Sequence, residues 1–133
     1  MGKDIPEDIK QFLFSHVDSV EQLEVILFLR QHSDKWWTAK GIADELRNSA
    51  SSVANRLKLI KSIGLIEENE SGQFHFNPSR PEDIILMERL AEVYKQRKHR
   101  IFEIIFSPMK RARNFADAFL INGSHKKDED NNG

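Results

Sequence analysis

Residues 50–63 carry hydroxyl, amide, guanidinium and ammonium groups at a spacing that could bind a polyanion. Val53, Leu57 and Ile60 recur at positions i, i+4 and i+7, which predicts a helix with one buried face. The polar side chains then fall on or beside the outer face; they are Ser51, Ser52, Asn55, Arg56, Lys58 and Lys61. These residue types form hydrogen bonds with phosphates and with base edges in the major groove of DNA. A solvated helix face uses the same residue types, so both interpretations are open at this point.

The segment before this helix predicts a second helix that would hold it in place. Thr38 is a good N-cap for a helix over residues 39–46, whose apolar residues point inward. Residues 48–49 form a polar turn and supply a cap for the helix that follows. Lys40, at the start of the preceding helix, could reach a flanking phosphate.

The residues after Gly64 change to the two-residue period of β-strands. Gly64 suits the left-handed conformation that ends a helix. Residues 65–67 are strand-like, residues 68–72 are turn formers, and residues 73–76 alternate polar and aromatic side chains. This pattern predicts a two-stranded β-hairpin. A very short strand is predicted over residues 36–38.

Helices are also predicted on both sides of this central region. A short helix over residues 7–15 follows Pro6. Asp18 and Glu21 have the spacing of a capping box, which predicts that a buried helix begins at Asp18. Pro81 lies near the first turn of a long helix over residues 82–105.

The order helix, helix, short strand, helix, turn, helix, hairpin is the plan of a winged helix-turn-helix domain. The residues WWTAKGIADEL and the following RNSASSVANRLKLIKSIGLIEENESGQFHFNP resemble the MarR-like, ArsR-like and related families of bacterial repressors. The shared features are a Thr-capped helix, a Ser-rich start to the next helix, and an exit through Gly64 into the hairpin, called the wing. The resemblance implies a mainly α fold with a small antiparallel β-wing. It also implies a bacterial transcription regulator that reads the DNA major groove with residues 50–63.

The chain is predicted to have four parts. Residues 1–80 form the winged helix-turn-helix domain, and residues 81–106 form a long C-terminal helix. In the resembling families, helices outside the DNA-binding region build a two-fold dimer, so we expect this helix to make a homodimer; a monomer whose helix covers its own core is the alternative. Residues 107–122 form an amphipathic tail segment. Residues 123–133 contain no apolar residue and are predicted to be disordered.

Charge is unevenly distributed along the chain, although the net charge is only −1. Residues 38–64 carry five basic and two acidic residues, and residues 95–113 carry seven basic and one acidic residue. Residues 65–79, which include the wing, carry three acidic residues and no basic residue. Repulsion by phosphates would push such a wing away from DNA. Either the wing does not contact DNA, or the whole domain binds protein instead.

The second basic segment supports an alternative function. Its basic and aromatic residues could form a solvated helix surface, contact phosphates outside the groove, or present an amphipathic face. In the last case the protein would be a winged-helix adaptor. It would bind a protein partner or a membrane surface through residues 95–121.

Several functional classes lack support in the sequence. The chain has no cysteine, its five histidines show no metal-binding spacing, and its six glycines are scattered. We therefore expect a non-enzyme with no metal and no cofactor. No apolar run approaches the roughly 20 residues that cross a bilayer, so the predicted location is the cytoplasm. The expected partners are double-stranded DNA and a second copy of the chain, with a possible protein partner for the C-terminal tail.

Overall fold

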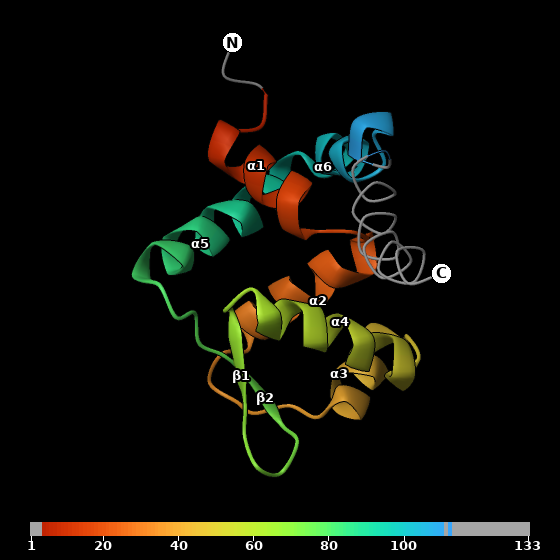
Figure 1. Ribbon diagram of the computed structural model, residues 1–133, viewed down its shortest axis with the longest axis vertical. Coiled ribbons are helices and arrows are strands. Elements are labelled where there is room, and N and C mark those ends of the chain that lie inside the picture. Colours follow the sequence, from red (N-terminus) through yellow and green to blue (C-terminus); the bar gives the residue numbers. More distant parts are fainter. Residues whose placement is uncertain (1–3, 111, 113–133) are drawn as a thin grey trace, which may run out of the picture.

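The computed structural model describes residues 4–110 and residue 112, and Figure 1 shows their arrangement. In this part of the chain, helices surround one hydrophobic core and a short antiparallel hairpin projects from it. The elements are α1 (Glu7–His16), α2 (Val20–Gln31), α3 (Ala39–Leu46), α4 (Ala50–Ser62), β1 (Ile66–Glu68), β2 (Phe74–Phe76), α5 (Pro81–Gln96) and α6 (Lys98–Ile105). The mainly α fold with a small antiparallel wing is confirmed. Most of the predicted tail segment 107–122 and all of the predicted disordered tail 123–133 lie outside the described residues.

Helix α2 begins at Val20, and its N-cap lies one residue after the predicted Asp18. Its N-cap is Ser19, whose Oγ accepts a hydrogen bond from the backbone N–H of Gln22 at 3.1 Å. The buried Gln22 side chain accepts from the backbone N–H of Asp18 at 3.0 Å and donates to the carbonyl of His16 at 2.7 Å. Gln22 therefore takes the role that the predicted capping box gave to Glu21. The carboxylate of Glu21 is left available for a contact elsewhere.

Helices α3 and α4 form the helix-turn-helix, and both begin at the predicted caps. Thr38 Oγ1 accepts from the N–H of Gly41 at 2.9 Å, and Ser49 Oγ accepts from the N–H of Ser52 at 3.1 Å. The turn between the helices passes through Arg47, which has a left-handed conformation with φ of 61°. Gly64 follows α4 with φ of 81°, as predicted for the residue that ends this helix.

The wing pairs Ile66 with Phe76 and Glu68 with Phe74. A single bridge between Trp37 and Phe74 joins the hairpin to the segment before α3, where the short strand was predicted. One face of the wing packs on the core through Ile66, Phe74 and Phe76. Glu68 pairs with Phe74 on this same face but is exposed, and Glu67 lies on the other face opposite His75. The hairpin lies at the end of the molecule opposite α1 and α6 (Figure 1).

The single helix expected over residues 82–105 is divided in two. At Arg97 the backbone leaves the helical region, with φ of −136° and ψ of 48°, and α6 then continues in a new direction. Ile101 and Ile105 are buried on α6, which packs against α1. A straight helix would carry these two side chains away from α1, so the bend keeps their apolar surface out of water.

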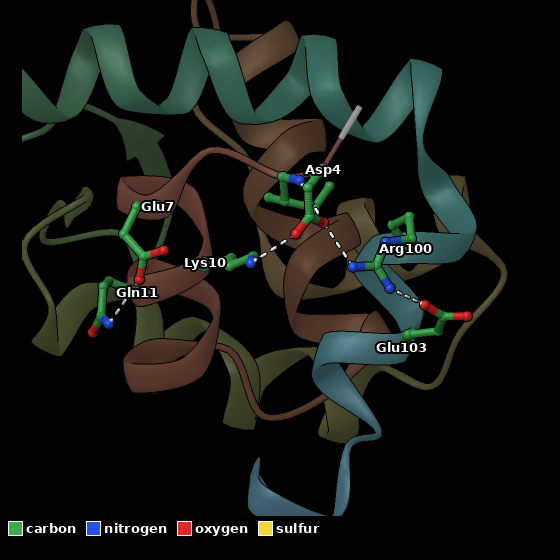
Figure 2. A network of polar contacts seen from close by, with 7 residues as sticks. Asp4, Glu7, Lys10, Gln11, Arg100 and Glu103 are labelled. Atoms are coloured by element: carbon green, nitrogen blue, oxygen red, sulfur yellow. Dashed lines mark hydrogen bonds and ion pairs between the residues drawn. The ribbon is translucent and has the colours of Figure 1, made fainter. Parts of the chain in front are cut away.

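Ion pairs fasten α6 to the start of the chain (Figure 2). Arg100 donates to Asp4 Oδ1 at 2.6 Å and also pairs with Glu103, while Lys10 donates to Asp4 Oδ2 at 2.9 Å. Hydrogen bonds from Arg100 and then from Lys10 hold the pKa of the Asp4 carboxyl well below its ordinary value. These contacts join residues far apart in sequence into one corner of the molecule.

Candidate nucleic-acid interface

Helix α4 buries the face that the sequence predicts and exposes the opposite one. Val53, Leu57 and Ile60 are fully buried in the core. The outer positions Ser51, Asn55, Lys58 and Lys61 are exposed, Ser52 and Arg56 are half-buried, and Lys40 is exposed on α3. The apolar side chain of Leu59 is also exposed on α4. All seven predicted DNA-contact residues thus reach the surface to some extent, but they differ in what they contact.

Two of the predicted residues contact a carboxylate of α2. Glu21 Oε1 accepts a hydrogen bond from Ser52 Oγ at 2.5 Å and another from Arg56 Nε at 3.0 Å. Helices α2 and α4 pack against each other, which brings these side chains together across 31 and 35 residues of sequence. Glu21 was predicted to cap α2, so the sequence pattern gave no signal of this contact.

Two predicted lysines form ion pairs at the surface. Lys61 Nζ lies 3.0 Å from Glu68 Oε1 of the wing, and Lys40 Nζ lies 3.0 Å from Asp44 Oδ2 one turn along α3. Exposed pairs of this kind contribute little to stability. A stronger anion can therefore compete for either lysine at small cost.

The remaining predicted residues are free to meet a ligand. Asn55 and Lys58 have no hydrogen-bond or ion-pair partner among the described residues, and Ser51 has only a 3.5 Å contact with the hydroxyl of Ser49. Arg47, which the sequence analysis did not select, is exposed in the turn before α4 and lacks a partner within residues 4–110. Its place between the two helices of a helix-turn-helix was the signal that could have found it.

The wing presents carboxylates to solvent, as its sequence indicates. Glu68 is paired with Lys61, and Glu67 lies near His75 and Asn77, while Glu70 at the tip is exposed. Only Lys61 places a positive charge against this hairpin among the ion pairs of the described residues. The wing therefore has no basic side chain of its own to offer a phosphate.

Two basic residues of the C-terminal segment are engaged within the protein, while Lys95 and Lys98 are exposed. The side chain of Lys110 is buried, donates to the carbonyl of Phe14 and lies 3.4 Å from Asp18 Oδ1. Arg100 is held by Asp4 and Glu103. Within the described residues, this segment is not a continuous free basic surface.

This arrangement defines a winged helix-turn-helix: α3 and α4 form the two-helix unit, and β1 and β2 form the wing. No family model matches the chain, and no curated protein matches it. Among solved structures, it is similar to MepR, a transcription regulator of the Staphylococcus aureus multidrug efflux pump MepA, with a TM-score of 0.51 and 17% identity over 89% of this chain and 87% of that one. A MepR variant bound to an oligodeoxyribonucleotide gives a TM-score of 0.51 with the same identity and coverage.

The Lactococcus lactis protein ZitR is also similar, with a TM-score of 0.47 and 14% identity over 90% of each chain. The likeness to MepR confirms at the level of the fold the resemblance expected from the sequence. Across the residues that the structure describes, no helix has the length and apolar character needed to cross a membrane.

Proposed function

We propose that the protein is a DNA-binding transcription regulator, and not an enzyme, that places α4 in the major groove. The observation that carries this proposal is the exposed polar face of α4, on which Ser51, Asn55 and Lys58 are available to a ligand while the opposite face is locked in the core. The N-terminus of α4 adds backbone N–H groups and a positive dipole end for a phosphate. The fold is shared with a MepR variant bound to an oligodeoxyribonucleotide, which supports this use of it.

The decisive experiment measures DNA binding by the protein and by an α4 variant. Sequences would first be selected from a random duplex library, and affinity would then be followed by fluorescence anisotropy at several salt concentrations. The double variant Asn55→Ala, Lys58→Ala should bind at least tenfold more weakly, because it loses a base-edge donor and a charge. The matched control is Lys95→Ala, which removes an exposed lysine from α5 and should bind normally. The absence of any selected sequence, or equal affinities of all three proteins, would contradict the proposal.

We also propose that the regulator acts as a homodimer through α5. Ile84 and Ile85 are 46% and 59% exposed on this helix, next to the buried Asp83 and Met87. Large apolar side chains exposed on one helix favour association through that helix. A two-fold dimer would present two α4 helices to successive turns of the major groove.

The dimer is tested by size-exclusion chromatography with light scattering. Ile85→Asp should convert a dimer to a monomer while the circular dichroism spectrum stays unchanged, because the side chain does not belong to the core. The control is Glu88→Gln, a change at another exposed position of α5 that should remain dimeric. A wild-type chain that elutes as a monomer at micromolar concentration would refute the proposal.

The second candidate function is the adaptor that binds a protein or membrane through residues 95–121. The observation in its favour is that Phe106 and Met109 are exposed just after α6. The burial of Lys110 and the pairing of Arg100 remove part of the free positive charge that an anionic membrane would attract.

Two measurements separate the adaptor from the DNA-binding regulator. A chain ending at Ala112 keeps Lys110 in place, and under the first proposal it should bind DNA like the full chain. Flotation with vesicles rich in phosphatidylserine would reveal membrane binding directly. Strong binding to vesicles that is lost on truncation, combined with no DNA binding, would favour the adaptor.

A further inference from the structure

One carboxylate holds both a serine and an arginine of the proposed reading helix. Glu21 Oε1 lies 2.5 Å from Ser52 Oγ and 3.0 Å from Arg56 Nε. The side chains of Arg56 and Glu21 are 29% and 18% exposed, so this is the most enclosed of the ion pairs around α4. A charge-assisted bond in such a setting fixes the rotamer of a long side chain.

The way in which Arg56 is held leaves its recognition end free. Only Nε bonds to Glu21, and the two terminal nitrogens have no partner among the described residues. The guanidinium group is planar and carries five N–H donors, so anchoring Nε also fixes the plane of the remaining four. Two parallel N–H groups in a fixed plane match the O6 and N7 acceptors of guanine in the major groove.

The negative charge of Glu21 also selects between two kinds of ligand. A phosphate that approached Arg56 would meet a carboxylate 3.0 Å from the same guanidinium group, and the two anions would repel each other. The edge of a guanine offers acceptor atoms without a net charge, so Glu21 opposes it much less. The pair therefore suits a base better than the DNA backbone.

We infer that Glu21 is a positioning residue that fixes Arg56 for bidentate recognition of one guanine in the major groove. This inference rests on the proposed DNA-binding function and adds the base that the helix reads. Ser52 is the second anchor, because its hydroxyl donates to the same carboxylate oxygen and limits the rotation of Glu21. Restricting a side chain before binding lowers the entropy lost on binding and sharpens discrimination.

The test measures discrimination between bases and does not depend on affinity alone. Each guanine of the selected sequence is replaced in turn by adenine, and the affinity ratio is measured for wild type and variants. The wild type should lose about tenfold or more at one position, which is the range of a good bidentate contact. Arg56→Ala should abolish the preference at that position alone.

Two substitutions of Glu21 separate positioning from charge. Glu21→Gln keeps a hydrogen-bond acceptor but removes the charge. Non-specific affinity should rise, because a phosphate is no longer repelled from Arg56. The guanine preference should fall to about threefold or less, because the hydrogen bond that anchors Arg56 is no longer charge-assisted. Glu21→Asp keeps the charge but is one methylene shorter, so the preference should fall with no rise in non-specific affinity. Melting temperatures of both variants show that the fold is retained.

The matched control is Glu68→Gln, which removes a carboxylate paired at the same 3.0 Å distance with Lys61 of α4. This variant should gain non-specific affinity and keep the full guanine preference, because a lysine acts as a point charge. Unchanged discrimination in both Glu21 variants would overturn the inference while leaving DNA binding intact. Arg56→Ala that weakens all sequences equally would also overturn it and would assign Arg56 to a phosphate. A wild-type protein without any DNA affinity would overturn the proposed function as well.

Discussion

Basic side chains gather in two regions of the molecule, on the helix-turn-helix and on α6 with the residues after it. In the C-terminal region, Arg100 bonds to Asp4 just before α1 (Figure 2), and Lys110 donates to the carbonyl of Phe14 on α1, so both hold this region against the N-terminal helix. In the helix-turn-helix, Arg47 and Lys58 point to solvent without partners among the described residues. Arg100 and Lys110 are thus used inside the fold, whereas Arg47 and Lys58 remain available to a ligand.

The difference shows that local pairing decides what a basic residue can do. A charged group that is already bonded and desolvated must give up those contacts before it binds a ligand, while an exposed one gives up only water. Mutations in the two regions should therefore change different properties of the protein. Changes in the C-terminal region should alter stability, and changes on α4 should alter binding.

Loss of Lys110 should give the largest effect, and the effect should be on folding. Lys110→Ala leaves the carbonyl of Phe14 without its ammonium donor and opens space where a fully buried side chain was packed. We expect a loss of about 2 kcal/mol in the free energy of unfolding, measured by urea denaturation. Lys110→Met restores most of the packing but not the hydrogen bond. Its free energy of unfolding should therefore lie between those of wild type and Lys110→Ala. A change below about 0.5 kcal/mol in Lys110→Ala would show that this region is a free basic surface after all.

Loss of Lys58 should change DNA binding and leave folding unaffected. Lys58→Ala should leave the free energy of unfolding unchanged within about 0.5 kcal/mol, because the side chain is exposed and unpartnered in the described part of the chain. The dependence of log affinity for DNA on log salt concentration should become less steep by about one, as expected for one lost phosphate contact. An unchanged salt dependence would place Lys58 away from the DNA backbone.

The sequence predicted the winged domain well because its local signals agree with its packing. The caps at Thr38 and Ser49, the apolar spacing along α4 and the Gly64 stop each depend on a few adjacent residues, and each lies where it was predicted. The polar face of α4 follows from the same spacing. These features require no knowledge of distant segments.

The features that the sequence could not supply depend on contacts between distant residues. The bend at Arg97 exists because Ile101 and Ile105 pack against α1, about ninety residues earlier in the chain. The contact of Glu21 with Arg56 depends on how α2 and α4 cross. The periodicity of a helix shows which face is apolar, but it does not show which helix will cover that face.

Acid should weaken the ion pairs that join the N-terminal residues to α5 and α6. Hydrogen bonds lower the pKa of Asp4, chiefly from Arg100, and that of Asp8, chiefly from Arg89. A carboxyl whose pKa is lower in the folded state stabilises the fold above its unfolded pKa of about 4, and that stability is lost as pH falls below this value. The melting temperature of wild type should therefore drop more between about pH 5 and pH 3 than that of Asp4→Asn, Asp8→Asn. Both groups are exposed, so the difference should be small; equal drops would show that these pairs do not support the fold.

The smallest effect is expected at the wing tip, which carries an exposed carboxylate. Glu70 is exposed at the end of an acidic hairpin, and repulsion keeps such a tip away from phosphates. If α4 alone contacts the DNA, a carboxylate farther than a Debye length of about 10 Å is screened. Glu70→Gln should then change DNA affinity by less than about twofold at physiological salt, with no change in the salt dependence. A larger gain in affinity would place the tip against the DNA backbone. The carboxylate of Glu70 would then weaken DNA binding by repulsion, and this single substitution would remove that repulsion.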